Sequence, residues 1–196
     1  THGSEFPSRF ARPRKGPSLF QGRDLFFSCF ASTVPPRASQ IRPPSRAVKI
    51  TLTANIAPPP GIVRWLPAQL RRLAALAGAA KATISLVLVD DAEMSDLPKQ
   101  YKNVRGTTDV LTFDLRDDPA DATQPVEGDI VLCLDEAVRQ ARTRGHDTRT
   151  ELLLYALHGL LHLLGFDDTT TRAFRKMHAK EDELLRAAGF GNVFEK

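Results

Sequence analysis

The sequence predicts an α+β fold, with one small mixed four-stranded sheet packed with about four to five helices. Four short segments rich in β-branched or apolar residues indicate strands, and helical periodicity lies between and after them. These strands and helices do not alternate strictly, which indicates α+β. The chain has 196 residues, 42% of them hydrophobic, which is enough for the core of one ordinary domain.

Four segments predict the strands. Residues 47–56, AVKITLTANI, alternate in character, and the three prolines that follow end the segment. Residues 82–91 are more fully apolar. The third and fourth strands are predicted at residues 107–115 and 128–135, on either side of a polar loop of turn residues.

Helices are predicted between and after these strands. Thr148 and Glu151 have the spacing of a capping box, and they predict the start of a helix that Gly165 ends as its C′ residue. Phe166 is expected to pack back on that helix. The other predicted helical segments are residues 61–80, a short helix within 91–106, 136–145 and 169–189.

Composition divides the chain near residue 46. Residues 1–46 hold seven of the 14 prolines and eight Lys or Arg against two acidic residues, and they predict a disordered tail or a transit-like segment. Residues 47–190 are the predicted functional domain, and residues 191–196 a short C-terminal tail. The formal charge of +4 belongs to the tail, so charge alone does not establish an RNA partner.

The chain is expected to work away from membranes and in a reducing compartment. Its longest apolar run, around residues 152–164, is well short of the roughly 20 residues that cross a bilayer. Cys29 and Cys133 are far apart and indicate neither a disulfide framework nor a thiolate metal site. We expect a cytoplasmic protein, or an organellar one if residues 1–46 are a transit peptide.

The segment LHGLLHLLGFDD, residues 157–168, carries the main chemical signal. His158 and His162 are four residues apart, which places them one above the other on a helix, with about 5–6 Å between their Cβ atoms. Leucines surround them, so the helix is expected to be buried and the imidazoles need partners other than bulk water. One metal ion would satisfy both, although a hydrogen-bonded pair of core histidines is the simpler alternative.

A third ligand is expected just after this helix. Gly165 turns the chain, and Asp167 or Asp168 could then return to the same ion, giving two nitrogens, one carboxylate and an open position, as in catalytic zinc sites. Either aspartate could instead cap the last helix. His178 and His146 are rival third ligands, although His178 reads more simply as a surface residue.

The residue after the first histidine separates two classes of hydrolase. In H-E-x-x-H metalloproteases it is the general base, and here it is Gly159, so a peptidase would lack its base. A phosphodiesterase needs a cation for the charge of its transition state. Lys102 and Arg105, just before the third strand, are candidates for that cation.

Several motifs together resemble the YbeY family of rRNA-maturation endoribonucleases. HGLLHLLGFDD is similar to the family signature H-G-x-L-H-L-x-G-Y-D-H, with Phe166 for Tyr and Asp168 for the last His. The resemblance spans about residues 47–188. Its further parts are TDVLTF at 108–113, GDIVLC at 128–133, Gly145-His146, Glu151, Met177 and Glu181.

The resemblance implies one α+β domain with a metal site at the end of a central buried helix. It implies one Zn²⁺ ion on His158 and His162, with Asp168 in the place of the third histidine. The implied activity is cleavage of single-stranded RNA in 16S rRNA 3′-end processing and ribosome quality control. The implied partners are rRNA and ribosomal or pre-ribosomal particles, and no oligomeric state is indicated.

Two departures from the family leave alternatives open. Lys102 follows Tyr101 where the family commonly has an Arg, and Lys lacks the planar fork that grips phosphate in two places, so Lys102 or Arg105 is the expected catalytic cation. The attacking group is either a metal-activated water or the 2′-hydroxyl of the RNA. The alternative functions are a ribosome-assembly binding factor with a structural or vestigial metal site, and a metal-dependent hydrolase of another substrate.

Overall fold

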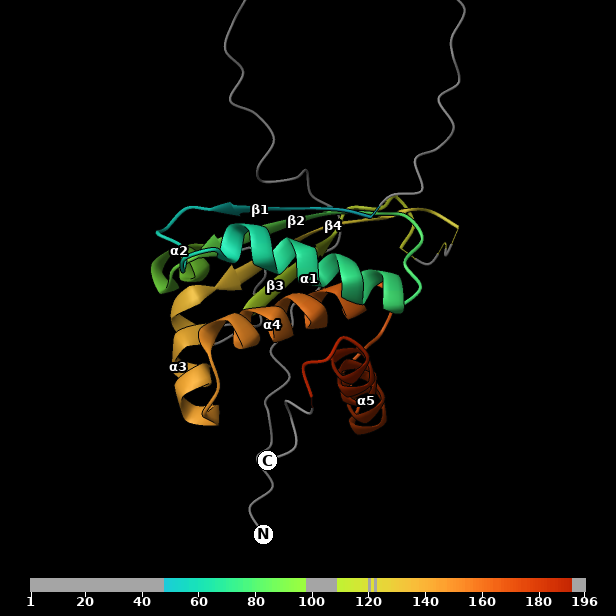
Figure 1. Cartoon of the computed structure of the whole chain (residues 1–196). Coiled ribbons are helices and arrows are strands. Elements are labelled where there is room, and N and C mark those ends of the chain that lie inside the picture. Colours follow the sequence, from blue (N-terminus) through green and yellow to red (C-terminus); the bar gives the residue numbers. More distant parts are fainter. Residues whose placement is uncertain (1–47, 98–108, 120, 122, 192–196) are drawn as a thin grey trace, which may run out of the picture.

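The structure is a computed structural model, and it describes residues 48–97, 109–119, 121 and 123–191 (Figure 1). It confirms the predicted α+β class. The elements in chain order are β1 (Val48–Ala54), α1 (Ile62–Leu76), β2 (Ala82–Val89), α2 (Asp91–Asp96), β3 (Val110–Asp114), β4 (Val126–Cys133), α3 (Leu134–Arg144), α4 (Thr148–Leu163) and α5 (Thr171–Ala187). The expectations for residues 1–46, and for all but the first residue of the tail 191–196, lie outside the described residues.

The four strands form one mixed sheet in the order β1-β2-β4-β3. β1, β2 and β4 run parallel, and β3 pairs antiparallel with β4 at the edge. The connection from β1 to β2 passes through α1, because parallel neighbours need a crossover rather than a hairpin. The helices α1 and α4 pack on the same face of the sheet (Figure 1).

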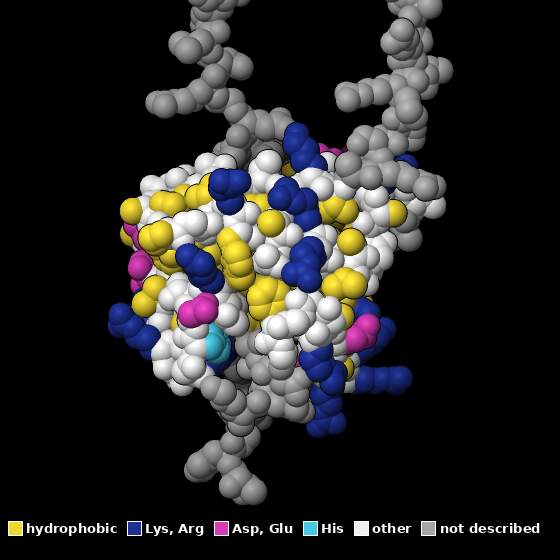
Figure 2. All heavy atoms as spheres, in the orientation of Figure 1, with side chains coloured by type: hydrophobic (Ala, Val, Ile, Leu, Met, Phe, Trp, Pro, Cys, Tyr) yellow, Lys and Arg dark blue, Asp and Glu magenta, His cyan; other side chains and the backbone are white. Residues whose placement is uncertain are grey.

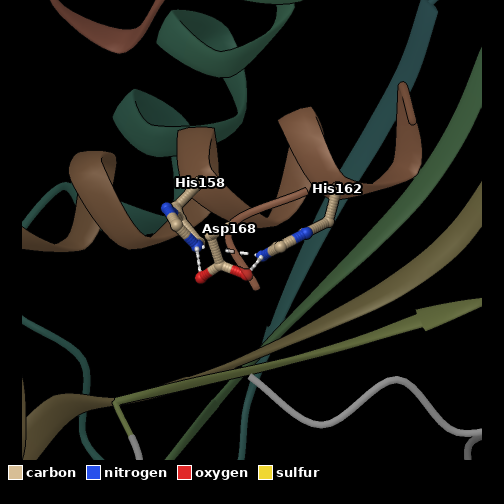
Figure 3. Close-up of side chains that lie close together, drawn as sticks. All are labelled: His158, His162 and Asp168. Carbon is tan, nitrogen blue, oxygen red and sulfur yellow. Dashed lines mark hydrogen bonds and ion pairs between the residues drawn. The ribbon is translucent and has the colours of Figure 1, made fainter. Parts of the chain in front are cut away.

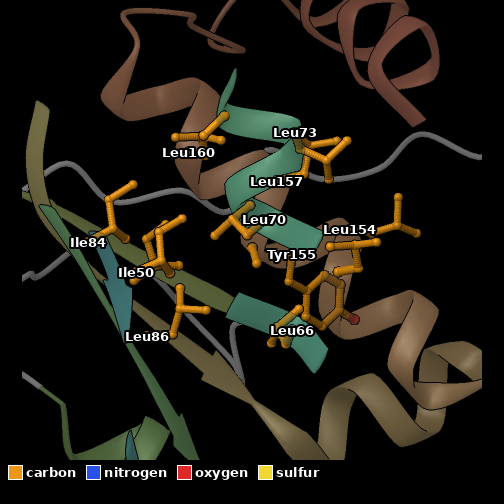
Figure 4. Packing of buried hydrophobic residues seen from close by; sticks show 14 of the residues in the cluster. Ile50, Leu66, Leu70, Leu73, Ile84, Leu86, Leu154, Tyr155, Leu157 and Leu160 are labelled. Atoms are coloured by element: carbon orange, nitrogen blue, oxygen red, sulfur yellow. The ribbon is translucent and has the colours of Figure 1, made fainter. Parts of the chain in front are cut away.

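The main core lies between that face and the two helices (Figure 4). α1 contributes Leu66, Leu70 and Leu73, which recur at three and four residues and therefore share one side of the helix. α4 is buried all round, from Glu151 to Leu163, as its leucine content predicts. A helix in this position holds its side chains away from water.

Gly159 sets how closely α4 approaches the sheet. A Cβ atom at this position would lie 2.8 Å from Thr112 Oγ1 on β3 and 2.9 Å from Ile130 Cγ2 on β4. Both distances are shorter than real contacts of a Cβ atom. The sheet therefore occupies the space that the glutamate of a metalloprotease would need. A side chain larger than that of glycine does not fit at this position unless the helix or the sheet moves.

The two ends of α4 differ in how well they follow the sequence. Gly165 has φ 89°, and the N–H of Phe166 donates to the carbonyl of Leu161, so the predicted C-terminal turn is confirmed. The predicted capping box is wrong, because the N-cap is Asp147, whose side chain accepts from the N–H of Thr150.

Among the described helices, none combines the length and the hydropathy needed to cross a membrane.

Candidate metal centre

The three residues predicted as ligands lie together (Figure 3). His158 and His162 project from α4, and Asp168 reaches them from the loop that follows Gly165. One ligand atom from each residue lies within 4.8 Å of the other two. Their exposed fractions are only 7%, 6% and 5% for His158, His162 and Asp168, so bulk water satisfies little of their polarity.

Hydrogen bonds fix the orientation of both imidazole rings. Nδ1 of His158 lies 2.6 Å from Oε1 of Glu181 on α5, and Nδ1 of His162 lies 3.2 Å from the carbonyl oxygen of Phe166. A carboxylate and a carbonyl can only accept, so each Nδ1 carries the hydrogen. In the neutral rings each Nε2 therefore keeps a lone pair, which is the arrangement typical of metal-binding histidines.

The two Nε2 atoms lie 3.0 Å apart. Two lone pairs at this distance repel each other unless a proton or a cation lies between them. Asp168 completes the group, with Oδ2 at 3.8 Å from Nε2 of His158 and Oδ1 at 3.9 Å from Nε2 of His162. Ligand atoms about 2.0–2.1 Å from a tetrahedral ion are about 3.3 Å apart, and the observed separations of 3.0, 3.8 and 3.9 Å bracket that spacing, so the donor set could hold one small metal ion.

The carboxyl group of Asp168 is buried, and its charge is only partly compensated within the described part of the chain. Its Oδ2 atom is buried and has no hydrogen-bond partner there. Burial raises the pKa of Asp168, and the charge of His158 only partly opposes this effect. A buried acceptor beside two imidazole lone pairs is a site that a cation would stabilise.

The loop geometry leaves the side chain of Asp168 free for this role. The N-cap of α5 is Thr170, whose hydroxyl accepts from the N–H of Ala173, so neither aspartate caps that helix. Asp167 instead holds the turn itself, because its Oδ1 accepts from the N–H groups of Asp168 and Thr169. The helix-cap alternative is therefore wrong for both residues.

Glu181 is the residue that single-motif reasoning misses. Its carboxylate bridges two imidazoles, with Oε1 at His158 and Oε2 at 2.6 Å from Nδ1 of His178. Burial acts to raise the pKa of Glu181, but the hydrogen bonds from His158 and His178 outweigh it and lower that pKa. The family motif pointed to Glu181, whereas its contact with His158 depends on how α5 packs.

The two rival third ligands lie elsewhere. His178 pairs with Glu181 and stacks edge-on against Phe174, with ring centroids 4.1 Å apart. His146 lies beside Glu151, with 3.0 Å between Nε2 and Oε2. Glu151 is fully buried, and Arg144 donates to it at 2.6 Å, so this pair stabilises the start of α4.

The predicted catalytic cations, Lys102 and Arg105, lie outside the described residues. Arg116 was not predicted from the sequence as a buried residue, and it lies near the end of α4. Its guanidinium pairs with Asp114 and donates to the carbonyl oxygen of Leu163 at 2.8 Å. Because these partners satisfy it, Arg116 supports the C-terminus of α4 and neutralises part of its dipole.

Comparisons with known proteins agree with the motifs. The family model described as Endoribonuclease YbeY matches residues 62–189. Relatives carrying the name Endoribonuclease YbeY include that of Acidothermus cellulolyticus, 44% identical over 116 residues, covering 54% of this chain and 70% of the relative. That of Moorella thermoacetica is 41% identical over 118 residues, covering 57% of this chain and 76% of the relative.

A longer alignment joins the chain to the Endoribonuclease YbeY of Gloeobacter violaceus, with 37% identity over 144 residues, 71% of this chain and 74% of that one. The solution structure of TM1509 from Thermotoga maritima superposes with a TM-score of 0.49 and 23% identity, over 70% of this chain and 90% of that one. The matched region contains α4, its two histidines and Asp168. The chain belongs to the YbeY family of endoribonucleases.

Proposed function

We propose that this chain is a zinc-dependent endoribonuclease that cuts single-stranded RNA in rRNA maturation, at the 3′ end of 16S rRNA, and in ribosome quality control. One observation carries the proposal: the Nε2 atoms of His158 and His162 face each other at 3.0 Å while both Nδ1 atoms are already hydrogen-bonded. The membership of the YbeY family supports RNA as the substrate.

The donor set supports zinc as the ion. Two imidazole nitrogens and one carboxylate oxygen, with a fourth position open, are typical of catalytic rather than structural zinc. His158, His162 and Asp168 would hold the ion, which would supply a Lewis acid for a phosphate oxygen and lower the pKa of water. The fit rests on the buried, unpartnered Oδ2 atom of Asp168 as well as on the histidines.

The residues of the chain itself have separate tasks in this proposal. Glu181 and the carbonyl group of Phe166 hold the two imidazoles in the tautomer that turns Nε2 toward the ion. Lys102 or Arg105 is the proposed cation that stabilises negative charge on the phosphate in the transition state. Gly159 leaves no room for the glutamate base of a peptidase, which favours a phosphodiester substrate.

The test is RNA cleavage by purified protein loaded with one equivalent of zinc. We expect single-stranded RNA to be cut and duplex RNA to be spared, and we expect His158→Ala and His162→Ala to abolish cleavage. Products with 2′,3′-cyclic ends would identify the 2′-hydroxyl as nucleophile, and 5′-phosphate ends would identify water. No cleavage by the zinc-loaded protein, or equal cleavage by both variants, would refute the proposal.

The ribosomal context is part of the same proposal. We expect the protein to associate with pre-ribosomal particles in the cytoplasm, or in an organelle if residues 1–46 are a transit peptide, with residues 47–190 as the active domain. A ribosome-assembly factor with a structural or vestigial metal site is favoured by the two departures from the family, Asp168 in place of a histidine and Lys102 in place of an arginine. It predicts particle binding that persists in His158→Ala and His162→Ala with no cleavage by the wild type.

A further inference from the structure

The exposed side of α1 carries arginines and no acidic residue. Arg64, Arg71 and Arg72 are all exposed on this helix. From Val48 to Val89 the chain contains five Lys or Arg and no Asp or Glu. Figure 2 shows this face of the molecule, where Lys and Arg side chains lie over α1 and β1 and the acidic side chains lie outside the area over α1.

Guanidinium groups extend along most of α1, from its N-terminus to Arg72. At its N-terminus, Arg149 of α4 donates from Nη2 to the carbonyl oxygen of Pro60 at 2.6 Å. Toward its C-terminus, Arg72 donates to the carbonyl oxygen of Ala188 at the end of α5. From Pro60 to Arg72 the chain advances 12 residues at about 1.5 Å each, so this row of cations is about 18 Å long.

These arginines have no carboxylate partner within the described part of the chain. Arg71, Arg72 and Arg149 donate to backbone carbonyl groups, and Arg72 also donates to the side-chain amide of Gln69. Arg139 on α3 differs, because it lies between the carboxylates of Asp91 and Glu136. Clustered cations without counter-charges attract a polyanion, such as a nucleic-acid backbone.

An aromatic pair lies among the arginines. Trp65, the one tryptophan of the chain, is half-buried on α1 and meets Phe190 edge-on, with ring centroids 6.1 Å apart. Seven residues are about two turns of an α-helix, so Trp65 and Arg72 share one side of α1. Aromatic rings between guanidinium groups are typical of surfaces that bind single-stranded nucleic acid, because unpaired bases stack on them.

This face is separate from the metal centre. On α4, His158 and His162 lie nearly opposite Leu160, which packs toward α1 (Figures 3 and 4). The metal centre and the outer side of α1 are therefore separated by two helix diameters, about 20 Å. A stacked strand advances about 3.4 Å per nucleotide, so an RNA that touches both places needs at least about six nucleotides.

We propose that the arginine face of α1, formed by Arg64, Arg71, Arg72 and Arg149 with Trp65, binds single-stranded RNA outside the metal centre. It anchors a long substrate, while the metal centre holds only the nucleotides around the cut. This inference rests on the proposed function for the cleavage step, but RNA binding by the face is measured independently of cleavage.

The first test uses the fluorescence of Trp65 in the zinc-loaded protein. We expect a 2′-O-methyl RNA of about 20 nucleotides, checked on a gel to be uncut, to change the emission and to bind less tightly as salt rises. Arg64→Gln and Arg71→Gln should each weaken RNA binding several-fold. In a plot of the logarithm of the binding constant against the logarithm of the salt concentration, each should reduce the steepness of the slope by about 0.7. Arg142→Gln is the matched control, because it removes an exposed arginine from α3, and we expect it to change neither quantity.

Unchanged RNA affinity and salt slope in both α1 variants, with native circular dichroism spectra, would overturn the inference. The inference would also be overturned if the two variants bound RNA as the wild type does but lost binding to vesicles of phosphatidylcholine and phosphatidylglycerol. The arginine face would then bind lipid and not RNA. Arg71→Lys should restore much of the affinity, since it returns the charge.

Turnover separates this inference from the proposed function. We expect Arg64→Gln and Arg71→Gln to raise KM for RNA of about 20 nucleotides with kcat unchanged, and to leave cleavage of an RNA of about four nucleotides unaffected. Cleavage of the long RNA with unchanged KM in both variants would refute the arginine face and leave the proposed function standing. If the wild type cut no RNA but bound it through these arginines, the proposed function would be refuted and the arginine face would stand.

Discussion

Replacing Gly159 with alanine tests how the sheet positions the metal centre. The new Cβ atom would lie 2.8 Å from Thr112 Oγ1 and 2.9 Å from Ile130 Cγ2, and the second atom belongs to a buried β-branched side chain that cannot swing away. α4 must therefore move off the sheet by several tenths of an ångström. One extra methyl group in a well-packed core costs about 1–3 kcal/mol.

Helix propensity opposes this cost. Alanine is favoured over glycine within a helix by about 1 kcal/mol, so we expect Gly159→Ala to lower the free energy of unfolding by roughly 0–2 kcal/mol. The reverse change at an exposed position of α1, Ala75→Gly, measures the propensity term alone. Urea titration of the metal-free proteins gives both values.

The same displacement should reach the metal centre, because position 159 lies between the two histidines. We expect Gly159→Ala to bind zinc more weakly, measured by competition with a chelator, whereas Ala75→Gly should bind it as the wild type does. A Gly159→Ala protein more stable than the wild type by the full propensity term, with wild-type zinc affinity, would refute the reasoning. It would mean that α4 tolerates a methyl group against the sheet.

Three further predictions concern single side chains. Asp168→Ala should lose zinc and Asp168→His should keep it by elemental analysis; equal zinc in Asp168→Ala and the wild type would remove Asp168 from the ligand set. Glu181→Gln should lower zinc affinity about 10–100-fold with an unchanged far-ultraviolet spectrum, because the carboxylate that orients His158 is lost; wild-type affinity would argue against this role. Burial raises the pKa of the Cys133 thiol from an ordinary value of 9.0 to about 12, so this thiol ionises at a lower pH in the unfolded chain than in the folded one. The free energy of unfolding should therefore fall as the pH rises above 9, and it should fall less in Cys133→Ala. Parallel pH profiles of the two proteins in urea titrations would contradict this.

Local patterns predicted what depends on local geometry. The histidine pair follows from helical periodicity, because residues four apart lie on one side of a helix wherever that helix packs. The turn at Gly165 follows equally from its conformation, since a φ of 89° suits glycine. The sequence therefore limits the third ligand to one of two neighbouring aspartates. Only the geometry of the loop distinguishes Asp168, the candidate ligand, from Asp167, which holds the turn.

Contacts between distant elements could not be predicted in the same way. Glu181 lies 23 residues after His158, and their hydrogen bond exists only because α5 packs against α4. Glu151 was assigned to a capping box by its spacing, but Arg144 and His146 draw its buried carboxylate into a different contact. Periodicity likewise does not reveal that β3 runs antiparallel at the edge of the sheet, because a strand has the same alternation in either direction.

The aspartate at position 168 links the metal centre to the arginine face. With zinc bound, Asp168 as a ligand and the ionised Glu181 would together carry two negative charges, which would offset the two positive charges of the ion. With a histidine at position 168 the same site would keep one positive charge. A metal centre without net charge would attract the phosphate backbone only weakly, so cations outside it would contribute more to holding a long RNA. The arginines of α1, which have no carboxylate partners within the described residues, can provide that attraction. Asp168→His should therefore reduce the dependence of KM on Arg64 and Arg71.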